Sequence, residues 1–209
     1  MPRASGARHV FINCPFDAGF ITHFQAMVFA VAACRFQVRC ARELNDAGEQ
    51  RIDKIYRLIE QSRYGIHDLS RTELDPVSNL PRFNMPFELG LFLAAKRFGG
   101  HDHETKRSLA FDVEPHRYQK FISDLAGTDI EDHGNDPRVM VEKIRNWLSD
   151  VSRRKRVPPT ARLLESYDEF VVALPAIAEK VGLVVASLHY GDLLRLIDEW
   201  VKSDPRLVV

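Results

Sequence analysis

The stretch His9-Val10-Phe11-Ile12-Asn13 decides the fold, because it is a short apolar run that ends in a polar residue. Such a run is typical of a strand buried on both faces of a parallel sheet. Similar runs recur at 36–40, 64–69 and 108–112, and amphipathic helical patterns separate them. This alternation predicts an α/β protein with a flavodoxin-like parallel sheet and flanking helices.

Helices are predicted between these strands and after the last of them. From Arg51 to Ser62, the residues Ile52, Ile55 and Ile59 share one face of a helix. The other predicted helices cover 18–34, 86–98, 116–125 and 137–151, and a short fifth strand is expected at 128–130. Together these elements define a predicted α/β domain at residues 1–152.

A second predicted part follows a basic, proline-containing linker at 153–159. Residues 160–209 contain three helical patterns, at 161–172, 174–181 and 190–202. Their apolar residues exceed what short isolated helices leave exposed, which favours oligomerisation or contact with a partner. We therefore expect a small C-terminal helical extension in a protein that forms homo-oligomers.

The composition argues against several classes of partner. Lys+Arg and Asp+Glu are equal at 29 each, so the net charge gives no indication of a nucleic-acid partner. No apolar run has the length of a membrane span, and no apolar segment typical of a secretory signal follows Arg3. The odd set Cys14, Cys34 and Cys40 lacks paired spacing and is typical of a reducing compartment. We expect a cytoplasmic protein.

Common cofactor motifs are absent from the sequence. It contains neither G-x-G-x-x-G nor G-x-x-x-x-G-K-[ST], which disfavours a Rossmann dinucleotide site and a P-loop. It also lacks a C-x-x-C pair for zinc. The cluster His101-Asp102-His103-Glu104 consists of adjacent residues in a turn, whose side chains cannot all converge on one ion. We expect no metal and no bound cofactor.

Polar side chains follow the predicted strands at the points where the strands end. In an open parallel sheet, ligands bind outside the carboxyl ends of the strands. The residues concerned are Asn13, Phe16 and Asp17 after the first strand, Arg51 after the second, and Asp68, Ser70, Arg82, Phe83 and Asn84 after the third. Because these residues come from separate segments and meet at one edge, they predict a small-molecule site.

Glu88 is the residue on which any chemistry at this edge would centre. Pro86 is typical of a first helical turn, which places Glu88 in that turn. There the helix dipole and the free backbone N–H groups favour an ionised carboxylate. Such a carboxylate can act as nucleophile or stabilise an oxocarbenium-like centre, with Asp68 as second carboxylate. A glutamate at this position can equally serve only as a helix cap.

Two arginines could hold an anionic nucleotide through bidentate contacts. Arg51 begins a helical pattern, where a solvated arginine is the alternative interpretation. Arg82 lies on the loop that should close over the site, which gives it the stronger claim.

Three segments resemble the nucleoside 2-deoxyribosyltransferase and TIR-like superfamily. Ile66-His67-Asp68-Leu69-Ser70 is similar to a strand that ends in Asp-x-Ser. Asn84-Met85-Pro86-Phe87-Glu88-Leu89-Gly90-Leu91 is similar to the helix that carries a catalytic Glu-x-Gly. Val10-Phe11-Ile12-Asn13-Cys14-Pro15-Phe16-Asp17 resembles the first strand and loop of bacterial TIR-like proteins. The resemblance extends from Arg8 to Asp150 and leaves the C-terminal extension unexplained.

This resemblance implies cleavage or transfer at an N-glycosidic bond of a nucleoside or of NAD. Glu88 would then be the nucleophile or stabiliser, and Asp68 would position the sugar or the base. The pocket would be lined by Asn13, Phe16 and Asp17, with Phe16 and Phe83 stacked against a base or ring. NAD or a related nucleotide would be the substrate.

The chain departs from the transferase pattern ahead of Glu88. Transferases usually have a glycine-rich turn there, whereas this sequence reads Leu80-Pro81-Arg82-Phe83-Asn84. The expected activity is therefore that of a TIR-like NAD glycohydrolase, a class of hydrolase that in bacteria often serves in antiphage defence. Two alternatives stay open: a module of the same fold that binds a nucleotide signal without cleaving it, and a nucleoside deoxyribosyltransferase.

Overall fold

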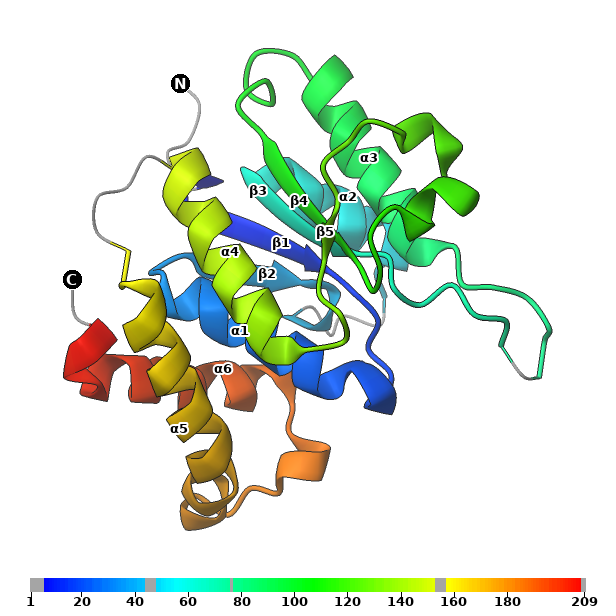
Figure 1. Ribbon diagram of the computed structural model, residues 1–209. Coiled ribbons are helices and arrows are strands. Elements are labelled where there is room, and N and C mark those ends of the chain that lie inside the picture. The colour runs from blue at the N-terminus through cyan, green and yellow to red at the C-terminus, as the bar shows by residue number, and fades with distance from the viewer. Residues whose placement is uncertain (1–5, 44–47, 76, 153–156, 208–209) are drawn as a thin grey trace. The chain divides into compact units, whose positions relative to one another are not determined.

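A computed structural model of the chain describes residues 6–43, 48–75, 77–152 and 157–207 (Figure 1). The chain divides into two compact units. The first, called the sheet unit here, comprises Met1–Phe20 and Val38–Asn135. The second, called the helical unit, comprises Ile21–Gln37 and Asp136–Val209.

The strands form one five-stranded sheet with the order β2-β1-β3-β4-β5. Their bounds are β1 His9–Asn13, β2 Gln37–Cys40, β3 Tyr64–Asp68, β4 Arg107–Asp112 and β5 Glu131–Asp132. The pairs β1–β3, β3–β4 and β4–β5 are parallel. This is the strand order of flavodoxin-like proteins, so the predicted α/β fold is confirmed.

The register aligns the ends of the central strands at one edge of the sheet. Asn13 of β1 pairs with His67 of β3, one residue before the end of that strand. Asp68 pairs with Phe111, and the next residue, Asp112, pairs with Asp132. The side chains of Asn13, Asp68 and Asp112 therefore leave the sheet at its carboxyl edge.

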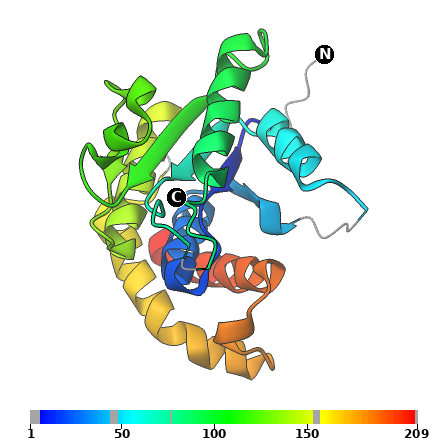
Figure 2. The same cartoon turned by 90° about the vertical axis from the view of Figure 1, so that its right-hand side faces the viewer.

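Within the sheet unit, α2 (Arg51–Gln61) and α3 (Asn84–Phe98) pack against each other and against β1. Figure 2 shows α2 in cyan and α3 in green beside the strands. A core of Phe11, Ile55, Leu58, Ile59 and Phe92 joins the two helices to β1. The apolar face predicted for α2 is the face that enters this core, since Ile55 and Ile59 are both buried.

Helix α3 begins two residues earlier than the sequence predicts. It starts at Asn84 instead of Pro86, and its first turn contains no acidic residue. Glu88 is therefore the fifth residue of the helix, and the expectation that it lies in the first turn is wrong. The free N–H groups of the helix start consequently belong to the preceding residues.

The segment between β4 and β5 also differs from the prediction. A single helix at 116–125 was expected, but two short 3-10 turns, Arg117–Lys120 and Ser123–Leu125, occupy this stretch. His116 has a left-handed backbone (φ 60°), which prevents a regular helix from starting there. The fifth strand follows at Glu131–Asp132, slightly later than the expected 128–130.

Between β3 and α3 the chain forms a long excursion, which we call the arm (residues 70–83). Leu74 and Pro81 form an antiparallel bridge across it. In Figure 1 the arm extends away from the strands of the sheet unit. Several of its apolar side chains are exposed, including Leu74, Leu80 and Phe83.

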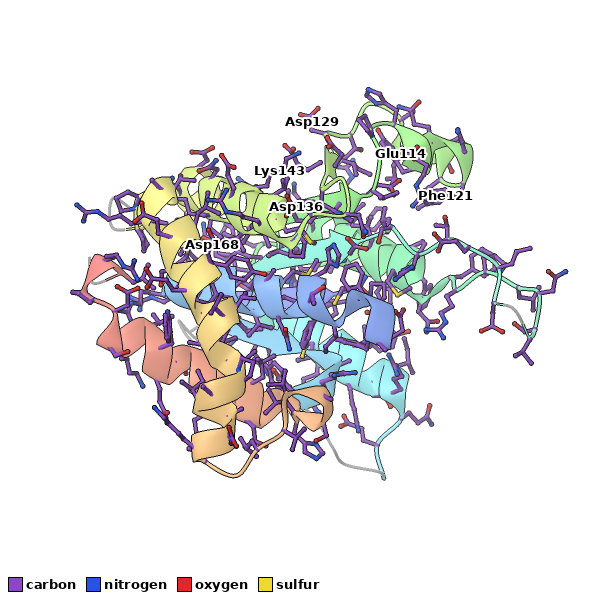
Figure 3. The ribbon with its side chains drawn as sticks, turned by 60° about the horizontal axis from the view of Figure 1, so that its bottom comes forward. Glu114, Phe121, Asp129, Asp136, Lys143 and Asp168 are labelled. Carbon is purple, nitrogen blue, oxygen red and sulfur yellow. The ribbon has the colours of Figure 1, made fainter. Side chains whose placement is uncertain are left out.

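The helical unit contains α1 (Ile21–Ala33), α4 (Pro137–Ser152), α5 (Thr160–Lys180) and α6 (Tyr190–Ser203). Within it, α1 packs against α4, α5 and α6. Helix α1 is apolar on nearly every side, and ten of its 13 residues are buried, as expected of a central helix. On the exterior, Asp168 of α5 (labelled in Figure 3) pairs with Arg138 of α4 at 3.1 Å.

Two features of the helical unit differ from the expected organisation. The patterns at 161–172 and 174–181 form one continuous helix, α5, with Pro175 inside it. The unit also includes α1 and α4, which the sequence assigned to a domain of residues 1–152. The basic run at 153–156 of the predicted linker lies outside the described residues. Within the described residues, no helix combines the length and apolar composition needed to cross a membrane.

Candidate functional site

Asn13, predicted to line a pocket, instead ties β1 to neighbouring elements. Its side chain is buried, and Nδ2 donates to Met85 O at 2.9 Å and lies 3.1 Å from His67 Nδ1. Burial lowers the pKa of His67 to about 3, so its ring is neutral and Nδ1 accepts the second amide hydrogen. Asn13 therefore positions the start of α3, the helix that carries Glu88.

The Asp68 side chain is fully buried at the end of β3. Its Oδ1 accepts hydrogen bonds from Ser70 N at 3.0 Å and from Ser70 Oγ at 2.5 Å. Its Oδ2 lies 3.2 Å from Nε2 of His133, which is also buried. Ser70 thus holds Oδ1, whereas Oδ2 lies near the His133 ring without a hydrogen bond to it. Asp68 and Ser70 come together as predicted, but they bind each other.

Asp112, at the end of β4, makes a second buried carboxylate contact. Its Oδ1 accepts from Val113 N at 2.7 Å and from Arg117 Nε at 2.8 Å. Burial raises the pKa of Asp112, and the Arg117 guanidinium opposes this shift. His133 N donates to Asp112 O at 3.0 Å, so the Asp68 and Asp112 contacts belong to one network across β3, β4 and β5.

Glu88 of α3 is a buried carboxyl with 7% of its surface exposed. Burial is the main cause that raises its pKa to about 7, and the Arg51 cation opposes the shift. The expectation of a helix-start glutamate held in its ionised form is therefore wrong, because desolvation is the dominant effect. A carboxyl group that titrates near neutral pH is suited to exchange a proton or to respond to a nearby positive charge.

The Cys14 thiol lies close to both Asp68 and Glu88. It is buried, and desolvation is the largest cause that raises its pKa well above the usual value. The charges of Asp68 and Glu88 raise this pKa further, and the Arg42 cation lowers it. Both predicted catalytic carboxyls thus act electrostatically on Cys14, which stays a protonated thiol.

Phe16 and Asp17, which follow β1, are partly buried and contact arginines. Arg42 donates through Nη2 to Phe16 O at 2.9 Å, and its guanidinium carbon lies 4.8 Å from the centre of the Phe16 ring. Asp17 Oδ1 lies 3.7 Å from Arg71 Nη2. One face of Phe16 is thus covered by a cation.

The remaining predicted binding residues are exposed. Arg51, Arg82 and Asn84 have solvent-accessible side chains, and Phe83 is 66% exposed. Arg51 acts on Glu88 electrostatically, which places it near the carboxyl centre. Arg82 acts instead on the pKa of Asp75 in the arm.

A cavity of about 280 Å³ lies elsewhere on the sheet unit, between α2 and α3. It is lined by Tyr56, Ile59, Glu60, Leu91, Ala95 and His103. None of the predicted site residues lines it. Among residues 6–43, 48–75, 77–152 and 157–207, no group of three or more His, Cys, Asp or Glu side chains is arranged to hold a metal ion.

Three residues of this site were not singled out as members from the sequence: Arg42, Arg117 and His133. His133 directly follows β5, so the same strand-end rule would have selected it had the fifth strand been placed correctly. Arg117 carried no comparable signal, because its acceptors are as far as 48 residues away along the chain.

No known protein family matches this chain, and no curated protein is significantly similar to it.

Proposed function

We propose that the sheet unit is a TIR-like N-glycosidase that cleaves the bond between ribose and base in NAD or a related nucleotide. One observation carries the proposal: Glu88 is a buried carboxyl at the carboxyl edge of the sheet, with its pKa raised to about 7. Protein interiors rarely retain such a group without a compensating role. The resemblance of Asn84–Leu91 to the glutamate helix of TIR-like proteins supports the same assignment.

The proposed reaction breaks the C1′–N bond of the nicotinamide riboside. Nicotinamide leaves as a neutral base with the bonding electron pair, and positive charge develops on the ribosyl ring. The ionised Glu88 carboxylate stabilises this charge, and the low polarity that raises its pKa strengthens the attraction. Water then adds to C1′ and releases a proton, which gives ADP-ribose.

The other predicted residues take supporting roles in this proposal. Asp68 orients the strand end and does not attack, because its side chain is fully buried and Ser70 holds its Oδ1. Arg51 and Arg82 face the anionic groups of the nucleotide, and Phe16 and Phe83 stack on its rings. A cytoplasmic homo-oligomer active in antiphage defence is the biological setting proposed here.

The decisive experiment compares the wild type with Glu88→Gln and uses Glu60→Gln as a control. Glu60 is an exposed glutamate on α2. Each protein is incubated with a nucleotide panel that includes NAD, and products are identified by mass spectrometry. We expect nicotinamide and ADP-ribose from the wild type and from Glu60→Gln, and no turnover by Glu88→Gln. Equal turnover by all three would remove Glu88 from the proposed role.

A second candidate function is nucleotide binding without cleavage. The burial of Asp68 favours it, because its side chain is inaccessible and Ser70 holds its Oδ1, which leaves Glu88 as the candidate catalytic carboxyl. In that case a nucleotide from the panel raises the melting temperature and is recovered intact. Exchange of the base of a deoxynucleoside for a free base would point instead to deoxyribosyltransfer.

A further inference from the structure

Arg117 makes the most extensive set of side-chain contacts at the carboxyl edge. Its Nε donates to Asp112 Oδ1 at 2.8 Å, and its Nη2 donates to the same oxygen. Nη2 also donates to Ser70 O at 2.7 Å and Leu69 O at 3.2 Å, while Nη1 donates to Thr72 Oγ1 at 2.6 Å. One guanidinium thus joins the end of β4 to the residues that leave β3.

The environment of Arg117 is that of a fixed internal cation. Its side chain is 17% exposed, and that of its partner Asp112 is 1% exposed. The Phe121 ring lies 5.4 Å from the guanidinium carbon. Figure 3 labels Phe121 and Glu114 in the segment after β4, on either side of Arg117 in the sequence. Because a planar guanidinium offers five donors in fixed directions, lysine cannot reproduce these contacts.

The backbone ahead of Arg117 is adapted to this arrangement. His116 has a φ of 60°, in the left-handed region that non-glycine residues seldom adopt. Such a conformation persists only where surrounding contacts hold it. Here it begins the 3-10 turn that contains Arg117, and the contacts of Arg117 are available to hold it.

The contacts of Arg117 end where the exposed part of the arm begins. Leu69 N donates to Phe111 O of β4 at 2.8 Å, and Arg117 donates to Thr72 Oγ1. The chain from Leu69 to Thr72 is therefore bound to β4 at its start and to Arg117 at its end. Beyond it, the hydrogen bonds of Asp75 stay within the arm itself. The arm then leads to α3 and Glu88, and Arg117 therefore determines the direction in which this segment leaves the sheet.

We infer that Arg117 is a positioning residue of the candidate site: it fixes the start of the arm and, through it, the approach to Glu88. Where it concerns turnover, this inference rests on the proposed function. The placement of the arm can be measured without any activity, which keeps the two questions separate.

The test uses the full chain with Arg117→Lys and Arg117→Gln, and Arg107→Lys as the matched control. Arg107 is an exposed arginine at the opposite end of β4. Hydrogen exchange followed by mass spectrometry reports on the amides of residues 69–75, and nicotinamide release from NAD gives kcat and KM. Asp112→Asn is an independent variant that weakens the same contact and serves if Arg117→Gln does not fold.

We expect exchange at 69–75 to become about tenfold faster in Arg117→Lys and to stay unchanged in Arg107→Lys. We expect kcat to fall about tenfold or more, with KM within about threefold, because a displaced Glu88 affects the reacting bond more than binding.

Unchanged exchange at 69–75 in folded Arg117 variants would overturn the inference. A rise in KM that accounts for the whole effect would also overturn it, since Arg117 would then contact the ligand. A wild type that releases no nicotinamide would refute only the proposed function, and the exchange data would still decide the inference.

Discussion

Asp68 Oδ2 and His133 Nε2 lie 3.2 Å apart, and both side chains are buried where β3 and β5 end. His133 Nδ1 accepts a hydrogen bond from Asn135 N at 3.0 Å, so this nitrogen carries a lone pair. Nε2 then carries a ring proton and lies near Asp68 Oδ2, although the two atoms do not meet hydrogen-bond geometry. This relationship gives Asp68 a fixed partner 65 positions further along the chain, and it changes the role that the sequence suggested for it.

Asp68→Asn is expected to lose more stability than activity per folded molecule. An amide at this position turns an NH2 group either towards the His133 Nε2–H or towards the Ser70 donors, so a donor faces a donor. The cost is about 1–3 kcal/mol in the free energy of unfolding. Urea unfolding measures it, with Ser70→Ala as the milder control. A variant of wild-type stability without activity would assign Asp68 to the chemistry.

Glu88→Gln is expected to stabilise the protein at alkaline pH. The folded pKa of Glu88 is about 7, above its ordinary value of 4.5, so its stabilising contribution is complete below pH 4.5. That contribution is lost as the pH rises through about 7, and the full shift corresponds to about 3 kcal/mol. Urea unfolding at pH 5 and pH 8 should show the variant's advantage growing with pH. Glu142→Gln, at an exposed site on α4, should show no such trend.

Arg51→Met is expected to move the pH dependence of the reaction upwards. The ionised form of Glu88 stabilises the sugar cation in the proposed mechanism, so kcat/KM for NAD should rise with pH around 7. Arg51 lowers the pKa of Glu88, and its removal therefore raises the midpoint. Arg63→Met, at the opposite end of β3, should leave the midpoint in place. A midpoint shared by all three proteins would separate Arg51 from Glu88.

Asn13→Asp is expected to destabilise the fold more than Asn13→Ala. Asn13 donates to Met85 O and to His67 Nδ1, both of which are acceptors. Alanine leaves these acceptors unpaired, at about 1–3 kcal/mol each, whereas aspartate also places its own acceptors against them. Thermal unfolding of the two variants gives the order. The reverse order would show that the amide packs in this site without acting as a donor.

The order and type of most elements of the sheet unit follow from local patterns in the sequence. β1 matches its predicted bounds, and α2 and β3 match theirs within one residue, because apolar periodicity is carried by neighbouring residues. The segment after β4 did not follow its pattern. A left-handed His116 and the contacts of Arg117 override the helical preference of that stretch.

The candidate site also contains residues that the sequence predicts and residues that it does not. The strand-end rule selected Asn13, Asp68 and Glu88, but it assigned each a ligand to bind, whereas Asn13 and Asp68 bind the protein itself. Arg117 and His133 could not be connected to the end of β3 from the sequence, since their partners there, Thr72 and Asp68, lie 45 and 65 residues away along the chain.

Local hydrophobic patterns in the sequence suffice to place Asn13 and Asp68 at the carboxyl edge of the sheet, because strand positions follow from such patterns. That Ser70 holds Asp68 Oδ1 and that the His133 ring lies beside Oδ2 emerges in the folded chain alone. Only the tertiary structure, again, raised the pKa of Glu88 to about 7. The physical reason is that desolvation and hydrogen bonding depend on which distant segments surround a side chain, and no local pattern carries that information.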